Sequence, residues 1–437
     1  MLLVYTHNLT PRVKYVFRQI FTQILGIKVT FSTDKHFFLN SNDPKISYTH
    51  SKLKEELFFQ SHPILFEKGV VERNINISKY NDLPCFFLVK NSTLSFDPFG
   101  ATFYMLTRYE EYLPHIKDKF GRFEAKESLA YKHGFLNKPV VDQWAQILKL
   151  ALIKKYPQLK FPTKKFKFIN TIDIDSAYLY LEKGIIRTIG AFLVDIFLFN
   201  YSNLLKRLKV IFGFEKDPYD NFNYILQLSK KHKLNTIFFF LLGDYDKYDK
   251  SISFSSKKFQ SKIKLVNDYC VVGLHPSYKS ISKNNFLFKE NERLQEIIHR
   301  EVIHSRQHYI KLDVPNMYNN LLKTSIKNDY SMGYATVPGF RSGTSNSYFF
   351  YDLNVETETD LKIHPFIVMD VTLKNYLGLD SRQSDLYIKN LIDEVKSVDG
   401  NFISIWHNQS LDFSGDWSGW ESVFKNMIKY ASGLINE

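Results

Sequence analysis

Residues 166–176 read F-K-F-I-N-T-I-D-I-D-S, an apolar run that ends in two carboxylates, Asp173 and Asp175. A short apolar run of this kind, bounded by polar residues, is typical of a strand that is buried on both faces of a parallel sheet. Side chains alternate along a strand, so Asp173 and Asp175 point to the same face. The stretch therefore predicts a buried strand that brings two like charges together at its carboxyl end.

The chain beyond residue 165 alternates between apolar runs and amphipathic segments. Strands are expected at Phe166–Ile174, Thr236–Leu242, Tyr269–Leu274, Tyr309–Leu312, Ile363–Asp370 and Phe402–Trp406. Helices are expected between them, at Pro218–Lys231 with Asp217 as N-cap, around Glu290–His304, and at Asn316–Lys327, Ser384–Lys396 and Trp420–Tyr430. This alternation predicts an α/β fold whose parallel sheet is either open or closed into a barrel. In both cases functional groups gather at the carboxyl ends of the strands.

The first 160 residues form a different pattern. A strand is expected at Leu2–Tyr5, and Thr10-Pro11 open a helix because proline suits the first helical turn. Further expected elements are a strand at Ile27–Phe31 and helices at 98–112 and 139–156. The stretch 156–165 holds two prolines and marks a boundary. We expect a smaller α/β or α+β domain over residues 1–160, without an assigned role, and a second domain over residues 161–437.

Composition places the chain among globular proteins, since 44% of its residues are apolar and 16% are aromatic. Its formal charge is +13, but the lysines are scattered and form no basic stripe interleaved with aromatic residues. We therefore expect no nucleic-acid partner and regard an anionic glycolipid as the better match. Cys85 and Cys270 lie apart in apolar stretches, which predicts free buried thiols and a reducing compartment.

The beginning of the chain has no apolar run of signal-peptide length. The most apolar stretch, Ile185–Phe199, is too short to span a bilayer and carries Arg187 and Asp195. It predicts a buried or membrane-surface helix. The expected location is the cytoplasm, with peripheral contact to the inner face of the membrane.

Polar residues follow most of the expected strands. Beyond Asp173 and Asp175 these are Gly243-Asp244, His275-Pro276-Ser277, Ser305-Arg306-Gln307-His308, Met369-Asp370 and Trp406-His407. A single histidine at a strand end is usually a structural residue. The set as a whole predicts a shared site.

The acidic pair suggests a divalent cation. Two carboxylates buried together repel each other, and one would keep a proton unless a cation binds. With Asp175 as a ligand, Asp173 would lie beside a water molecule whose pKa the cation lowers to about 7. The alternative is a solvated pair that caps a following helix at Ser176. The local sequence leaves both interpretations open.

Four short motifs resemble a known family, the polysaccharide deacetylases or NodB-homology carbohydrate esterases. Residues 171–175 (T-I-D-I-D) resemble the opening motif, and residues 236–243 resemble the second strand of the family. Gly273-Leu274-His275 and Ile405-Trp406-His407 resemble its metal-histidine and closing motifs. The resemblance covers about residues 165–435, and longer stretches are similar to a bacterial envelope-glycan subgroup with an extra N-terminal domain.

The resemblance implies a distorted (β/α) barrel and a metal-dependent hydrolase that removes an N-acetyl or O-acetyl group from a sugar. Its implied substrate is an envelope polysaccharide or a lipopolysaccharide precursor. Position by position, it implies that Asp173 is the general base and His407 the general acid. Asp175 and His275 would bind the metal, and Arg306 would orient the base.

One position departs from the family pattern. The family usually has a second histidine four residues after the first, where this chain has Lys279. A catalytic zinc ion, the expected cofactor, prefers three protein ligands. His308 is the best substitute for the missing histidine ligand. His304 is a weaker candidate; it lies four residues before His308, so on a helix the two could bind a metal as a pair. Alternatively, Lys279 itself replaces the charge of the cation.

Other residues are candidates for supporting roles. Asp370 would hold the imidazole of His407 in the correct tautomer. Arg341, in the Gly- and Ser-rich stretch 334–345, would bind substrate oxygens. Ser277, Tyr278 and Trp417 are further candidates for sugar contact, and Trp417 would stack on a pyranose ring. An ordinary turn for Arg341 and ordinary packing for Trp417 are the competing interpretations.

The sequence thus favours a sugar deacetylase with two rivals. One is a barrel that binds glycan without turnover, because the second histidine is missing. The other is a glycoside hydrolase that uses Asp173 and Asp370 as its carboxylate pair. The sequence indicates neither the sugar nor the oligomeric state.

Overall fold

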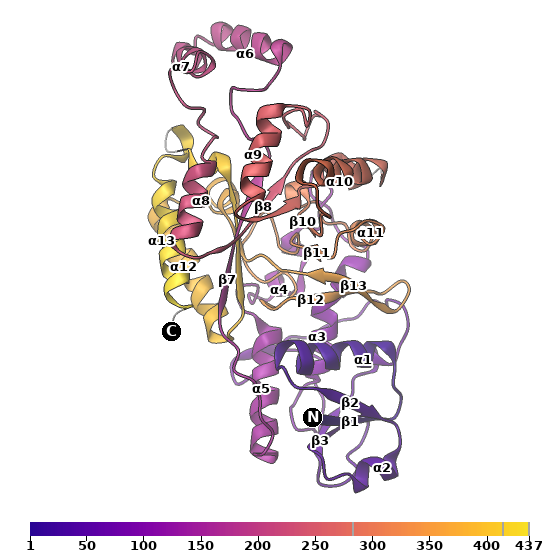
Figure 1. Cartoon of the computed structure of the whole chain (residues 1–437). Coiled ribbons are helices and arrows are strands. Elements are labelled where there is room, and N and C mark those ends of the chain that lie inside the picture. The colour runs from indigo at the N-terminus through magenta and orange to yellow at the C-terminus, as the bar shows by residue number, and fades with distance from the viewer. Residues whose placement is uncertain (282–283, 413–414, 436–437) are drawn as a thin grey trace.

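The computed structural model describes residues 1–281, 284–412 and 415–435 (Figure 1). A parallel sheet of four strands, in the order β2-β1-β3-β4, occupies the N-terminal part. Its strands are β1 (Leu2–Thr6), β2 (Val29–Ser32), β3 (Lys45–Thr49) and β4 (Leu57–Gln60). The N-terminal helices are α1 (Pro11–Phe17), α2 (Lys35–Asn40), α3 (Pro98–Leu106), α4 (Leu129–Lys132) and α5 (Val140–Lys155), and a small hairpin joins β5 (Ser78–Tyr80) to β6 (Leu83–Cys85).

The predicted helix start at Thr10-Pro11 is confirmed. The Thr10 hydroxyl accepts a hydrogen bond from the Val13 amide and so caps α1, and Pro11 occupies its first position. The helix expected over 98–112 ends early, because Arg108 adopts a left-handed conformation with φ of 53°. A separate 3₁₀ turn covers Tyr109–Tyr112.

The larger sheet contains nine strands in the order β12-β13-β11-β10-β9-β8-β7-β15-β14. Their bounds are β7 (Lys167–Ile174), β8 (Asn235–Phe240), β9 (Val271–Leu274), β10 (His304–Ser305), β11 (Asn328–Asp329), β12 (Tyr348–Asp352), β13 (Thr357–Ile363), β14 (Val368–Met369) and β15 (Asn401–His407). All neighbours pair in parallel except β12 and β13. The predicted α/β class is confirmed. Within the described chain no pairing joins β14 to β12, so a barrel is not confirmed.

Helices pack outside this sheet (Figure 1). They are α8 (Phe222–Lys231), α9 (Lys257–Asn267), α10 (Asn284–Ile298), α11 (Asn316–Leu321), α12 (Ser381–Ser397) and α13 (Trp420–Gly433). The helix α8 begins after Asn221, so Asp217 does not cap it as expected. The Asp217 carboxylate instead accepts hydrogen bonds from the amides of Leu179, Tyr180, Leu181 and Tyr219.

Two expected strands are wrong. Residues 309–312 do not form a strand, because Tyr309 and Ile310 have φ of 61° and 51°, whereas a strand needs extended backbone. The strand in this region is β10, and His308–Ile310 form a 3₁₀ turn. The segment 363–370 contains the end of β13 and, after a break, the two-residue β14.

Residues 185–199 were expected to form a buried or membrane-surface helix, and a helix is present there but is not buried. Its residues form α6 (Ile185–Phe197), which α7 (Tyr201–Ile211) follows, and only Asp195 is buried in α6. Among the described residues no helix is both long and apolar enough to cross a membrane. Both cysteines are free thiols, as expected, with Cys85 buried and Cys270 half-buried.

A buried ionic network connects the N-terminal segment to the loop before β12. The two Glu111 oxygens accept hydrogen bonds from Arg341, at 2.9 Å from Nε and 2.7 Å from Nη2. Arg108 contacts Glu111 at 2.7 Å and the hydroxyl of Tyr334 at 3.0 Å. Removing one member would leave buried charge unpaired, so this network fixes the position of the loop.

The N-cap of α3 is a buried polar centre and gives a stability prediction. Both Asp97 oxygens accept hydrogen bonds, one from the amides of Phe99 and Gly100, the other from the Tyr48 hydroxyl and the His62 amide. Asp97→Ala should lower the free energy of unfolding by about 2–4 kcal/mol, because the cap is lost and donors are left buried without acceptors.

The matched control for this prediction is Asp34→Ala. Asp34 caps α2 in the same way, but at the surface. This substitution should lower the free energy of unfolding by about 1 kcal/mol or less, because water can accept the hydrogen bonds that the carboxylate accepted. Urea unfolding of both variants checks the difference, and an equal loss in the two would contradict the role of burial.

Candidate active site

The ends of five strands, β7, β9, β10, β14 and β15, contribute residues to one cavity. In the sheet, Asp173 at the end of β7 lies opposite His407 of β15 and Phe239 of β8. Gly273 of β9 permits the close packing, because a Cβ at this position would lie 2.7 Å from the Phe239 ring. The cavity has a volume of 160 Å³. Its lining residues are Arg122, Asp173, Asp175, His275, His308, Tyr309, Ile310, Ala335, Met369, Val371, Tyr376, His407 and Gln409.

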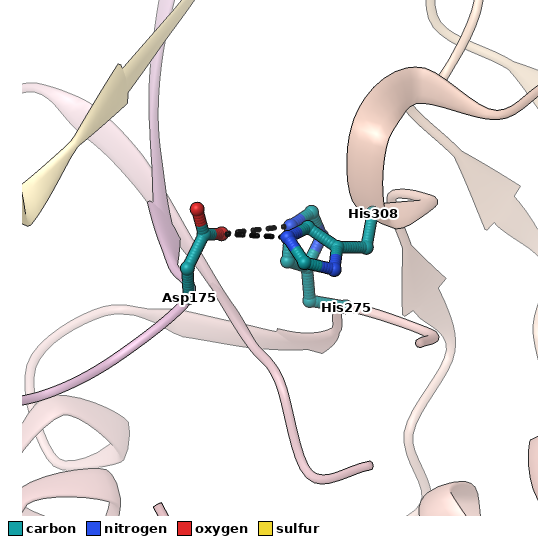
Figure 2. A group of neighbouring side chains, drawn as sticks. All are labelled: Asp175, His275 and His308. Carbon is teal, nitrogen blue, oxygen red and sulfur yellow. Dashed lines mark ion pairs between the residues drawn. The ribbon is translucent and has the colours of Figure 1, made fainter. Parts of the chain in front are cut away.

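Three of these side chains point toward one another (Figure 2). The Asp175 Oδ1 lies 3.2 Å from Nε2 of His275 and 3.6 Å from Nε2 of His308. One ligand atom from each residue falls within 4.8 Å of the other two. His308 reaches this place because its backbone amide bonds to the Pro276 carbonyl, just after His275. An oxygen and two imidazole nitrogens at this spacing can surround a single metal ion.

The surroundings of the triad favour metal binding by these atoms. Nδ1 of His275 bonds to the Arg306 carbonyl at 2.6 Å, and Nδ1 of His308 bonds to Asp249 at 2.8 Å. These contacts turn both Nε2 atoms toward Asp175, as oxygen acceptors do for the histidines of metal sites. The Asp175 side chain is 27% exposed, but its Oδ1 is buried and has no hydrogen-bond partner. A cation would satisfy this oxygen.

Asp173 has a different partner from Asp175. Its Oδ1 accepts a hydrogen bond of 2.9 Å from Nη1 of Arg306, which also donates to the Thr171 hydroxyl. Arg306 is completely buried, and its Nε donates to the Tyr330 carbonyl. Because the guanidinium is held on two sides, it fixes the orientation of the Asp173 carboxylate. The second oxygen of Asp173 lies 3.9 Å from His275.

His407 is held by Asp370. The Asp370 Oδ1 lies 2.8 Å from Nδ1 of His407, and Oδ2 accepts from the His407 amide at 2.7 Å. Asp370 also accepts a hydrogen bond from the Val371 amide. Nε2 of His407 faces the cavity, 4.0 Å from Oδ2 of Asp175. This arrangement gives His407 a fixed ring orientation and one nitrogen free to exchange a proton inside the cavity.

The charges in the site shift the pKa values of three groups. Burial alone would raise the pKa of Asp175, but the cationic forms of His308 and His407 hold it well below its usual range. Burial alone would lower the pKa of His308, yet Asp175 and Asp249 raise it to about 9. In the same way Asp370 and Asp175 overcome burial and raise the pKa of His407 to about 10. His407 therefore carries its proton at neutral pH.

Several predicted site residues lie elsewhere. Lys279 is half-exposed and pairs with Asp246 at 2.7 Å, outside the cavity lining. It does not take the place of the cation, since its ammonium points to the surface. His304 belongs to β10, so the helical pair that it would form with His308 does not exist. Its ring contacts Tyr330 and lies outside the triad.

The four residues predicted to contact substrate are also absent from the cavity lining. Arg341 is buried in its pair with Glu111, and Ser277 bonds to Glu290 through its hydroxyl and its amide. Tyr278 packs on Tyr248 and donates to the Phe120 carbonyl. Trp417 packs against Trp420. Their sequence motifs lie near the site, but their side chains serve packing and ion pairing.

Other residues of the site were missed by sequence reasoning. Asp249, which orients His308, lies in a loop after β8 whose local pattern gives no signal. Arg122 lines the cavity although it belongs to the N-terminal segment. Its guanidinium contacts Asp118, the Tyr309 carbonyl and the Tyr376 hydroxyl. Contacts between such distant segments are not visible in local sequence.

Comparisons with known proteins give a family match over the N-terminal part and structural likenesses over 62–63% of the chain. A family model described as a family of unknown function (DUF7033) matches residues 2–157. No curated protein matches the chain. Among solved structures, a proposed polysaccharide deacetylase from Mycobacterium smegmatis is similar at 11% identity and a TM-score of 0.41, covering 63% of this chain and 87% of that one.

Two Bacillus structures are similar as well. A CE4 family pseudoenzyme from Bacillus anthracis has 12% identity and a TM-score of 0.31, with 62% of each chain covered. A polysaccharide deacetylase from Bacillus cereus has 12% identity and a TM-score of 0.30, covering 62% of this chain and 88% of the other. At these low scores, the roles of the side chains rest on the geometry of the site and not on the likeness.

Glu290 gives a pH-dependent prediction. Burial and the charge of Asp249 raise its pKa to about 7, despite two hydrogen bonds from Ser277. Between its ordinary pKa of 4.5 and about 7, the folded protein keeps this proton and the unfolded chain loses it. Raising the pH through this window therefore lowers stability. Between about pH 5 and about pH 8, the free energy of unfolding of wild type, measured with urea, should fall by about 2–3 kcal/mol more than that of Glu290→Gln. An equal loss in both proteins would refute the raised pKa.

Proposed function

We propose that the protein is a metal-dependent hydrolase that removes an N-acetyl or O-acetyl group from a sugar. The observation that carries this proposal is the convergence of Asp175, His275 and His308 on one point beside two held catalytic groups. Asp173 is fixed by Arg306 and His407 by Asp370. A ligand triad with one base and one acid at its edge matches the needs of amide hydrolysis.

The residues of the triad fit a divalent cation, and we propose zinc. Asp175 would offer its buried Oδ1, and His275 and His308 would each offer Nε2. Such an ion supplies a Lewis acid for a carbonyl oxygen and lowers the pKa of water. Three protein ligands leave positions open for water and substrate, as in catalytic zinc sites.

Asp173 then acts as the general base. Its carboxylate lies next to the triad, 3.9 Å from His275, and can accept the proton of the attacking water. Arg306 keeps it oriented through a buried hydrogen bond. Two like charges at the end of β7 thus take different roles, one as a metal ligand and the other as a base.

His407 acts as the general acid. Its Nδ1 is engaged by Asp370, so its Nε2 can deliver a proton to the leaving nitrogen or oxygen of the sugar. The charge of Asp370 raises the pKa of His407 and so favours the protonated form that an acid needs. Water attack at the acetyl carbonyl, proton uptake by Asp173 and proton delivery by His407 together yield acetate and a free amine or hydroxyl.

The rival hydrolase has less support. A glycoside hydrolase would need a free Asp370 carboxyl facing the substrate. Both Asp370 oxygens accept hydrogen bonds, and the residue is 1% exposed. A glycan-binding protein without turnover is the remaining rival, and it differs from the enzyme in releasing no acetate.

The substrate class follows from the motifs of the sequence. Their resemblance to the envelope-glycan subgroup supports an acetylated envelope polysaccharide or a lipopolysaccharide precursor as the substrate. The same resemblance supports a distorted barrel formed from the nine-stranded sheet. We propose a cytoplasmic site of action. The cavity of 160 Å³ can hold an acetyl group and part of one sugar ring, so most of the glycan would lie outside it.

Metal content tests the triad. Purified wild type should hold about one equivalent of zinc per chain, whereas Asp175→Ala and His308→Ala should lose most of it, because two ligands hold zinc weakly. The matched control is His304→Ala, which removes a nearby histidine outside the triad. It should keep its zinc. Equal zinc in all four proteins, measured by atomic emission, would show that the triad is not the binding site.

Acetate release tests the catalytic roles. Asp173→Asn and His407→Ala should each lower the rate on acetylated envelope glycans by about 100-fold or more, and Asp370→Asn by about 10-fold or more. Lys279→Ala should stay close to wild type, because its ammonium lies outside the cavity. Zinc content should stay near wild type in Asp173→Asn. Release of reducing ends instead of acetate would favour the glycoside hydrolase, and no turnover with zinc bound would favour the binding protein.

A further inference from the structure

The segment that connects β7 to α8 stands out from the rest of the molecule. Residues 184–216 contain α6 and α7, which project beyond α9 at the end of the molecule (Figure 1). The base of this α6–α7 segment is tied together by Asp217, whose carboxylate accepts hydrogen bonds from residues 179–181 before it and from Tyr219 after it. The segment is therefore an ordered projection.

Polar side chains connect α6 to α7. Asp195 of α6 pairs with Arg207 of α7 at 2.8 Å and accepts a second bond from Asn203 at 2.7 Å. Both Asp195 and Arg207 are buried, and the guanidinium lies over the rings of Tyr180 and Phe192. The inner side of the segment thus includes a buried ion pair, and Val210 of α7 is buried as well.

The outer side of the segment is apolar. Of the 31 large apolar residues that are exposed in the described chain, 14 lie within residues 185–214. Side chains with exposed fractions between 62% and 88% include Ile186, Leu193, Phe197, Phe199, Phe212 and Phe214. Water is a poor environment for so many exposed apolar side chains in one segment, and large apolar surfaces mark contacts with membranes or partners.

The charge of the segment favours an anionic partner. It carries five cationic residues, at positions 187, 206, 207, 209 and 216, against two acidic ones, Asp195 and Glu215. Asp195 neutralises Arg207, and Glu215 pairs with Lys209. The segment keeps a positive balance, and the whole chain has a formal charge of +13. Apolar residues together with basic residues are the combination by which surface helices bind anionic bilayers.

We propose that residues 185–214 dock the protein on an anionic lipid bilayer, with α6 lying in the headgroup region. The helix has 13 residues and so measures about 20 Å, less than the roughly 30 Å of a hydrocarbon core. Phenylalanines at the turn after α6 and at the end of α7 enter the bilayer. A fluid bilayer can enclose such a projection on all sides, whereas a protein partner would need a matching groove.

The docking surface lies at the same end of the sheet as the candidate active site. Asp175 follows β7 directly, and α6 begins ten residues later in the chain. Docking would therefore hold this end of the molecule toward the lipid. The proposal does not depend on deacetylation, because lipid binding is measured without turnover.

Vesicle flotation tests the proposal with two variants. In the first, Phe197, Phe199, Phe212 and Phe214 are all changed to Ser. In the control, Leu150 on α5 and Leu386 on α12, which are 67% and 59% exposed, are changed to Ser. Wild type and control should float with vesicles of phosphatidylcholine and phosphatidylglycerol. The four-residue variant should lose at least about 10-fold in affinity, and neutral vesicles should bind wild type less.

A second measurement places the segment in the bilayer. Phe199→Trp should gain fluorescence quenching by brominated lipids beyond that of wild type, which reports insertion at this residue. Wild type that does not float at low salt, or a four-residue variant that floats as well as wild type, would overturn the proposal. A concentration-dependent dimer in sedimentation, lost in the four-residue variant, would instead assign this surface to a second copy.

Discussion

Two carboxylates that leave a buried strand on the same face must each be neutralised, and the site follows from this constraint. Asp173 receives a completely buried guanidinium, Arg306, which is held on its other side by a backbone carbonyl. Asp175 receives two imidazoles, whose remaining nitrogens are held by oxygen acceptors. A single short strand, β10, leads into both Arg306 and His308. Its position beside β9 therefore gives the two acids different partners, and the proposed mechanism uses one as a base and the other as a ligand.

The rest of the fold supports this separation from outside the strand ends. The buried contact of Glu111 with Arg341 fixes the loop before β12, and Asp370 fixes His407 from the neighbouring β14. The N-terminal segment takes part directly, because Arg122 lines the cavity and bonds to the carbonyl of Tyr309. Residues 1–160 thus contribute Arg122 to the wall of the cavity. This gives them a role that their own sequence does not indicate.

The sequence predicted those features that depend on local pattern. The apolar run before Asp173 identifies β7, and Thr10-Pro11 identify the start of α1, because strand burial and helix capping are short-range effects. The turn at His308–Ile310 was missed, since two residues with positive φ break an apolar stretch that otherwise reads as a strand. Asp217 was expected to cap a helix but binds amides near residue 180, a contact between distant segments. The contacts of Arg341 with Glu111 and of Asp249 with His308 also join distant segments. Charge and loop composition alone therefore could not predict them.

The proposed function requires one cation between Asp175, His275 and His308. A crystal structure measured at the zinc absorption edge, from protein purified without chelator, tests this most directly. We predict one anomalous peak about 2.0–2.2 Å from Oδ1 of Asp175 and from Nε2 of both histidines. The proposal would be contradicted if the zinc ion in such crystals lay at other residues and the three side chains of the triad bonded directly to one another.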